Sequence, residues 1–236
     1  MGHGPPPSDA SEPVTLTVSD STRVSGLWLR PLEAKTCLVL AHGAGAGMRH
    51  VAMQLLAIDL ADRGVATLRY NFPYMERGSK RPDPPPLCHA TVRAAVAEAA
   101  RRAPELPLAA GGRSFGGRMT SQAQAASALP GVRGLAFVAF PLHPAGQPSD
   151  TRAAHLFATH VPLLFLQGTR DALAELALLE PLVQRLGPRA TLQLIADADH
   201  SFHVPAASGR RDADVRRELA GQLASWLAEL PPRGAA

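Results

Sequence analysis

Short apolar runs alternate with stretches of helical periodicity along most of this sequence, and that alternation limits the folds open to it. The apolar runs predict buried strands at 36–41, 65–70, 106–110, 132–140, 161–167 and 191–196. The periodic stretches predict helices at 49–63, 90–102, 115–129, 173–186 and 212–230. Such an order predicts an α/β fold with a mostly parallel central sheet and helices on both faces.

The two ends of the chain differ from this pattern. Two segments at 14–18 and 24–29 alternate apolar and polar residues, and they predict an N-terminal antiparallel hairpin. Residues 1–13 are rich in Gly, Pro, Ser and Asp and are predicted to be a disordered tail. Residues 14–236 are predicted to form a single domain. The proline-rich stretch 71–87 is predicted to be a loop, and no insertion is long enough for a large lid.

Composition excludes several function classes. Cys37 and Cys88 have no partner at metal-ligand spacing, so we expect no metal site, and no cofactor is implied. The formal charge of +4 is spread without blocks of like sign, which predicts no nucleic-acid partner. No secretory signal precedes the domain and no apolar run is long enough to span a bilayer, so we expect a cytoplasmic protein without a membrane partner. The number of subunits is left open.

The segment Gly112-Arg113-Ser114-Phe115-Gly116 has the pattern G-x-S-x-G between a predicted strand and a predicted helix. A serine on such a tight turn projects its hydroxyl outward, and small residues on either side relieve the crowding. The helix that begins here also aims backbone N–H groups at the serine, which favours developing negative charge. We therefore predict that Ser114 is a nucleophile; the alternative is a glycine-rich turn that only closes an α/β unit.

A candidate acid and a candidate base follow the serine along the chain, in the order Ser, Asp, His that a nucleophilic serine of this kind of fold requires. Asp171 comes after the strand at 161–167 and a glycine turn, where its carboxylate could orient an imidazole. It could also cap the next helix, and Glu175 is a second candidate acid. His200 follows the last predicted strand and is the predicted base; the competitors are His203 and, more distantly, His42.

The oxyanion of an acyl-transfer reaction needs two fixed backbone N–H donors. Phe115, directly after the serine, is predicted to supply one. Ala44, in the glycine-rich loop after the first buried strand, is predicted to supply the other, with Gly45 as the alternative. A phosphate-binding loop is excluded because no Gly-Lys-Ser/Thr follows, and because His50 stands where the last glycine of a G-x-G-x-x-G pattern begun at Gly45 belongs.

Three further residues are candidates for substrate binding. Phe72 and Tyr74 lie in the loop after the second buried strand and could line an acyl site, or they could pack and fix that loop. Arg113 could bind an anionic substrate group, or it could pack within the fold and pair with a carboxylate.

Four segments carry a resemblance to a known family: A-H-G-A-G-A-G at 41–47, R-Y-N-F-P-Y at 69–74, G-G-R-S-F-G-G-R at 111–118 and D-H-S-F at 199–202. The chain resembles the α/β-hydrolase superfamily in its dienelactone-hydrolase-like branch. More narrowly, it resembles small bacterial hydrolases related to the hydrolase-like domain of a testis-expressed protein and of a chromatin-complex subunit. The resemblance implies the α/β-hydrolase fold and a triad of Ser114, Asp171 and His200. Dienelactone hydrolases use a cysteine nucleophile, so their substrate is not transferred to this chain.

Two functions are consistent with these residues. The first is a carboxylesterase-like serine hydrolase that cleaves small acyl esters or thioesters through an acyl-enzyme, with a small-molecule acyl substrate as its partner. The second is a non-catalytic interaction module that keeps the same fold. The complete serine, acid and base set favours the first.

Overall fold

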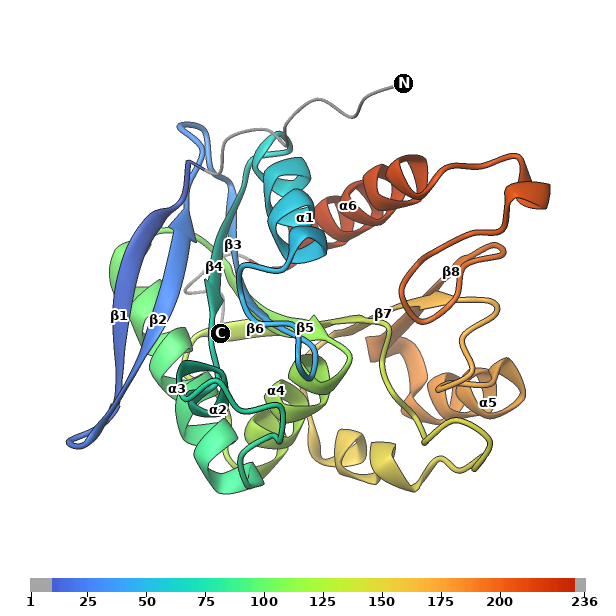
Figure 1. Cartoon of the computed structure of the whole chain (residues 1–236), viewed down its shortest axis with the longest axis horizontal. Helices are drawn as coiled ribbons and strands as arrows, with labels where there is room; N and C mark the ends of the chain where they lie inside the picture. The colour runs from blue at the N-terminus through green and yellow to red at the C-terminus, as the bar shows by residue number, and fades with distance from the viewer. Residues whose placement is uncertain (1–9, 232–236) are drawn as a thin grey trace.

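A computed structural model describes residues 10–231, and an eight-stranded sheet runs through its centre (Figure 1). The strands are β1 (Glu12–Ser19), β2 (Thr22–Leu29), β3 (Thr36–Ala41), β4 (Val65–Tyr70), β5 (Leu108–Arg113), β6 (Val132–Val138), β7 (Leu163–Gly168) and β8 (Ala190–Ile195). Their order across the sheet is β1-β2-β4-β3-β5-β6-β7-β8. The β1–β2 and β2–β4 pairs are antiparallel and all later pairs are parallel, which confirms the predicted fold class and its N-terminal hairpin.

Helices cover both faces of the sheet (Figure 1). The α-helices are α1 (Val51–Ala61), α2 (Pro73–Glu76), α3 (Pro85–Arg102), α4 (Phe115–Ala126), α5 (Leu176–Leu186) and α6 (Asp212–Ala228). Short 3₁₀ helices are η1 (Thr151–Ala158), η2 (Gly187–Arg189) and η3 (Ala206–Ser208). Helices α1 and α6 lie side by side on one face, and α3, α4 and α5 lie on the other.

The burial of strand β3 explains why all of its residues are apolar or small. All six of its residues are buried, because helices cover the sheet on both sides of it. Side chains alternate along a strand, so Cys37 and Val39 pack into the cluster under α3 and α4. Leu38 and Leu40 pack instead into the cluster under α1 and α6.

The observed helix boundaries differ from the predicted ones in the proline-rich stretch 71–87. The predicted loop 71–87 contains α2, and α3 begins at Pro85 rather than at residue 90. Proline is compatible with the first turn of a helix, since its missing N–H would have no intrahelical partner there. Prolines at 84–86 therefore mark a helix start that the sequence interpretation placed five residues too late.

Other boundaries shift by a few residues. Strand β1 begins at Glu12, so the last two residues of the predicted tail are in the sheet, and residues 1–9 lie outside the described part. Strand β5 runs to Arg113, directly before the serine turn. Helix α5 begins at Leu176 rather than at 173, because 171–175 form turns.

The parallel strands carry their following loops to one edge of the sheet. The loops after β3, β5, β7 and β8 therefore meet there, as expected for the carboxyl ends of parallel strands. The connections after β4 and β6 add only α2 and η1 beside this edge, which agrees with the predicted absence of a large lid in the described chain.

Candidate active site

A tight turn joins β5 to α4 at Ser114, the single residue between the two elements. Its backbone has φ 49° and ψ −115°, a conformation that costs a non-glycine residue about 1–3 kcal/mol. Neighbouring glycines permit the turn. A methyl group on Gly112 would lie 2.5 Å from the Ala41 oxygen, and one on Gly116 would lie 2.5 Å from the His42 oxygen. The turn leaves Ser114 partly exposed at the carboxyl edge of the sheet.

A chain of hydrogen bonds links this serine to a histidine and an aspartate from two other loops. The Ser114 Oγ lies 2.8 Å from His200 Nε2, and His200 Nδ1 lies 2.7 Å from Asp171 Oδ2. The three residues are far apart in sequence and meet because β5, β7 and β8 are parallel strands. Each imidazole nitrogen is thus within reach of one partner, the arrangement that general-base activation of a hydroxyl requires.

The Asp171 carboxylate is buried, and its two oxygens have separate partners. Oδ1 accepts a hydrogen bond from the Leu173 N–H at 2.8 Å, as in a turn cap. Oδ2 accepts from His200 and also from the Gln167 amide group. The cap and the contact with the histidine therefore coexist on one side chain. Among the described residues, Asp171 is the one acidic residue that shares a hydrogen bond with His200, and Glu175 does not contact the imidazole.

Gln167 is a residue that the sequence interpretation missed. Its side chain is buried at the end of β7, its Oε1 accepts from the Phe140 N–H at 2.9 Å, and its Nε2 donates to Asp171. These two contacts fix the direction of the amide, so it presents a donor to the carboxylate. A lone polar residue ending an otherwise apolar strand was the available signal.

The loop after β8 is held in shape by its own aspartate. The Asp199 carboxylate accepts from the N–H groups of Ser201 at 2.7 Å and His203 at 3.0 Å. The loop also passes over the end of β7, where a methyl group on Gly168 would lie 2.2 Å from the Ala198 oxygen. Asp199 therefore shapes the histidine loop and does not contact the imidazole of His200.

Both residues predicted to supply oxyanion donors line the same cavity as the serine. Ala44 and Phe115 line a cavity of about 450 Å³ together with Ser114. In the part of the chain that the structure describes, neither of their N–H groups has a hydrogen-bond acceptor within the protein. The Gly45 N–H, in contrast, donates to the Tyr74 hydroxyl at 3.3 Å. The geometry therefore favours Ala44 over Gly45 as the second donor to an oxyanion.

Comparison with known proteins assigns this chain to a family. Residues 34–228 match a family described as an alpha/beta hydrolase domain. The chain belongs to that family. Its fold is similar to that of a dienelactone hydrolase from Anabaena variabilis, with a TM-score of 0.75 and 20% identity over 93% of this chain and 97% of that one.

Two further solved structures have the same fold. A lidless α/β serine hydrolase from Xanthomonas campestris, XC6422, has a TM-score of 0.70 and 21% identity, covering 97% of this chain and 100% of that one. Esterase Est22, solved with p-nitrophenol, has a TM-score of 0.70 and 18% identity, covering 93% of this chain and 80% of that one. Identities at this level establish the shared α/β-hydrolase fold alone.

In this α/β-hydrolase, Phe72 and Tyr74 pack inside the protein. Both side chains are fully buried, and both rings contact the Phe115 ring, at centroid distances of 5.4 Å and 6.4 Å. They do not line the cavity beside Ser114. This corrects the expectation that they line an acyl site: the aromatic rings bury against one another and fix the loop that carries Ala44.

Arg113 also faces away from the serine cavity. It lines a separate cavity of about 270 Å³ together with residues of α1 and α6. Burial lowers the pKa of its guanidinium, and nearby Asp199 opposes that shift. The expectation that Arg113 binds a substrate group beside the nucleophile is therefore corrected, because consecutive residues of the turn point to different sides.

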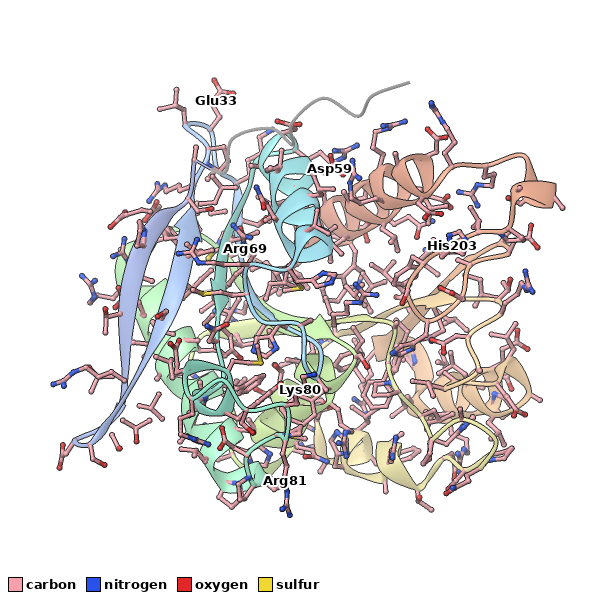
Figure 2. All side chains as sticks on the ribbon, viewed as in Figure 1. Glu33, Asp59, Arg69, Lys80, Arg81 and His203 are labelled. Atoms are coloured by element: carbon pink, nitrogen blue, oxygen red, sulfur yellow. The ribbon has the colours of Figure 1, made fainter. Side chains whose placement is uncertain are left out.

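The two competing histidines have other contacts. His42 is fully buried, with Nδ1 donating to the Gly43 oxygen at 2.7 Å and Nε2 accepting from the Phe72 N–H at 3.1 Å. Burial lowers its pKa to about 4, so it is neutral. His203 lies on the loop between β8 and α6 (Figure 2) and pairs with Asp212, 2.9 Å away. Neither contacts Ser114.

A second serine–histidine contact joins α4 to η1. The Ser121 Oγ is 2.7 Å from His155 Nε2 and also donates to the Arg118 backbone oxygen. Ser121 is fully buried, and no carboxylate contacts His155 in the described chain. Burial lowers the pKa of His155 to about 4. This contact therefore joins η1 to α4, and it does not present a nucleophile to the cavity.

Residues 10–231 contain neither a cluster of metal-ligating side chains nor a membrane-spanning helix. No group of three or more His, Cys, Asp or Glu side chains is placed to hold a metal ion. No described helix is long and apolar enough to cross a membrane.

Proposed function

We propose that this α/β-hydrolase is a serine hydrolase that cleaves small acyl esters or thioesters through an acyl-enzyme on Ser114. The observation that carries the proposal is the hydrogen-bonded chain from Ser114 Oγ through His200 to Asp171. The backbone conformation of Ser114 adds support, because a turn with no chemical role would relax about 1–3 kcal/mol of strain by adopting an ordinary conformation.

The first half of the reaction forms the acyl-enzyme. The Ser114 Oγ attacks the carbonyl carbon while His200 Nε2 takes the hydroxyl proton, and the carbonyl oxygen becomes an oxyanion. The N–H groups of Phe115 and Ala44 stabilise that oxyanion in this proposal. His200 then passes its proton to the leaving alcohol or thiol, and the ester bond breaks.

The second half reverses these roles with water. His200 takes a proton from water, the hydroxide attacks the acyl carbon, and the proton returns to Ser114 as the acid is released. The buried Asp171 carboxylate holds Nδ1 protonated and stabilises the imidazolium in both halves. The steps use only groups of this chain and water.

Labelling with a fluorophosphonate probe tests the nucleophile. We expect the wild-type protein to be labelled and Ser114→Ala to be unlabelled, because only an activated serine reacts with the probe. Ser121→Ala is the matched control, since it removes the other serine that contacts a histidine, and it should be labelled like the wild type.

Turnover is then measured with p-nitrophenyl esters of increasing acyl length, a choice suggested by the p-nitrophenol bound to esterase Est22. Equal labelling of Ser114→Ala and wild type would refute Ser114 as the nucleophile. Wild-type protein that is neither labelled nor active on any ester would overturn the proposal and favour a non-catalytic interaction module.

A further inference from the structure

Two arginines border the cavity beside Ser114. Arg118 comes from α4 and Arg152 from η1, and both line the cavity of about 450 Å³ that contains the serine. Arg118 follows Ser114 by one helical turn, and its N–H donates to the Ser114 oxygen at 3.1 Å. Side chains four residues apart lie on one face of a helix, with Cβ atoms about 6 Å apart. The Arg118 side chain thus begins close to the serine.

Neither guanidinium has an anionic partner in the described chain. No carboxylate lies within 4.0 Å of Arg118 or Arg152, whereas most other arginines whose side chains are described have such a partner or bond a backbone oxygen. The Arg118 Nε is buried without a hydrogen-bond partner. A buried, unpaired donor of a charged group is costly, and an oxyanion ligand would satisfy it.

No free anionic group of the described residues offsets the positive charge of the two arginines, although the Arg118 guanidinium lies over the Phe115 ring, 5.9 Å from its centroid. Asp83 is the acidic residue that lines the cavity, but its carboxylate is already paired with Arg77 and accepts the Tyr74 N–H. Burial raises the pKa of nearby Cys88 to about 12, so that thiol is neutral. His155 is neutral as well, as described above.

Burial and the neighbouring Arg152, in that order, lower the pKa of Arg118. Two arginines that repel each other at the rim of one cavity would both be stabilised by a shared anion.

The 3₁₀ helix η1, which carries Arg152, is anchored to the rest of the protein. The contact between Ser121 and His155 holds η1 against α4. Arg189 adds a second tie, since it donates to the Thr159 hydroxyl at 2.9 Å and to the Leu156 oxygen at 3.1 Å. Because η1 is anchored in this way, its backbone needs little reorganisation when Arg152 binds a ligand.

We propose that Arg118 and Arg152 bind an anionic group of the substrate, a carboxylate or a phosphate, a few bonds from the carbonyl that Ser114 attacks. This inference rests on the proposed hydrolase function and specifies its substrate class: esters that carry a negative charge. Guanidinium groups suit this role because their planar N–H donors match the oxygens of carboxylate and phosphate in pairs. The anion belongs either to the acyl part or to the leaving group.

Matched ester pairs distinguish these two sources. For the acyl part, p-nitrophenyl monoglutarate is compared with its isostere in which two methyl groups replace the carboxylate oxygens. For the leaving group, para-acetoxybenzoate is compared with para-isopropylphenyl acetate. We expect kcat/KM to favour the charged member of at least one pair by about tenfold or more, the usual size of a charge-assisted hydrogen-bond contribution.

Variants assign that preference to the two arginines. Arg118→Gln and Arg152→Gln should each reduce the charged-to-neutral ratio of kcat/KM by about tenfold, and Arg118→Lys should keep more of it than Arg118→Gln. The matched control is Arg101→Gln, because Arg101 is an exposed arginine at the far end of α3, where it pairs with Glu98. It removes the same charge and should leave the ratio unchanged.

The experiments distinguish a failure of the anion site from a failure of the proposed hydrolase function. Wild-type protein that is labelled by the fluorophosphonate and hydrolyses the neutral esters, but shows no preference for a charged ester, refutes the anion site alone. A preference that survives in both glutamine variants, or that Arg101→Gln abolishes equally, refutes it as well. Wild-type protein that is neither labelled nor active on any of the four esters refutes the proposed function and the anion site together.

Discussion

Replacing Gly116 by alanine tests the packing that shapes the serine turn. The added methyl group would lie 2.5 Å from the His42 oxygen, 2.7 Å from the Ala41 carbonyl carbon and 2.7 Å from the Ala41 Cβ. All three atoms belong to the backbone or Cβ of the segment at the end of β3, so none can rotate away. Overpacking of this kind costs about 1–3 kcal/mol, against a helix-propensity gain of at most about 1 kcal/mol.

We therefore expect Gly116→Ala to lower the free energy of unfolding by about 1–2 kcal/mol net. To relieve the contacts, the start of α4 must move away from β3 and carry Ser114 and the Phe115 N–H with it. A displacement of about 1 Å at reacting groups reduces turnover by about 100-fold, so esterase activity should fall more than stability does.

The matched control is Gly221→Ala, the same substitution inside α6. There the methyl group would meet only Arg63 Nε, at 3.9 Å, so helix propensity should dominate and raise the free energy of unfolding by about 0.5–1 kcal/mol. Urea denaturation followed by circular dichroism measures both variants. A Gly116→Ala protein as stable as the wild type, with unchanged ester turnover, would refute the steric reasoning.

Three further predictions concern the site and its histidines. Asp171→Asn should reduce kcat about 100- to 10,000-fold, because the amide carries no charge and its NH₂ would face the Gln167 or Leu173 donor. Circular dichroism should show an intact fold, and near-native turnover would refute Asp171 as the acid. His200→Ala should lose as much ester turnover as Ser114→Ala, whereas His203→Ala should stay within about threefold of wild type, since His203 pairs with Asp212; reversed effects would exchange the two histidines. The unfolded chain protonates His42 below about pH 6.5, but the folded protein does so only near pH 4, so the free energy of unfolding should fall by up to about 1.4 kcal/mol per pH unit as the pH is lowered from 6.5 to 4. His42→Gln should lose this part of the pH dependence in urea titrations at several pH values, and the same pH dependence in the variant would contradict the prediction.

Much of the fold follows from local patterns. The apolar runs with intervening helical periodicity predict strands at 36–41 and 65–70 with the bounds that the structure has, because a strand covered on both faces needs apolar residues on both. The start of α3 was missed because the prolines at 84–86 were interpreted as loop residues, although proline fits the first turn of a helix. The stretch 141–159 was interpreted as a loop with room for one helical turn, whereas the structure has the longer 3₁₀ helix η1 there. Contacts with α4 and Arg189 hold it, and these come from segments distant in sequence.

The sequence by itself determined the sheet, the serine turn and the order of Ser114, Asp171 and His200. These features depend on backbone rules that act over a few residues, and parallel strands then bring their carboxyl ends to one edge. Only the tertiary structure decided which side chains face the cavity. Arg113 precedes Ser114 yet points to another cavity, while Arg118 and Arg152 meet beside the serine from two elements. The direction of a side chain depends on the twist of its turn and on packing against distant segments, which no local pattern encodes.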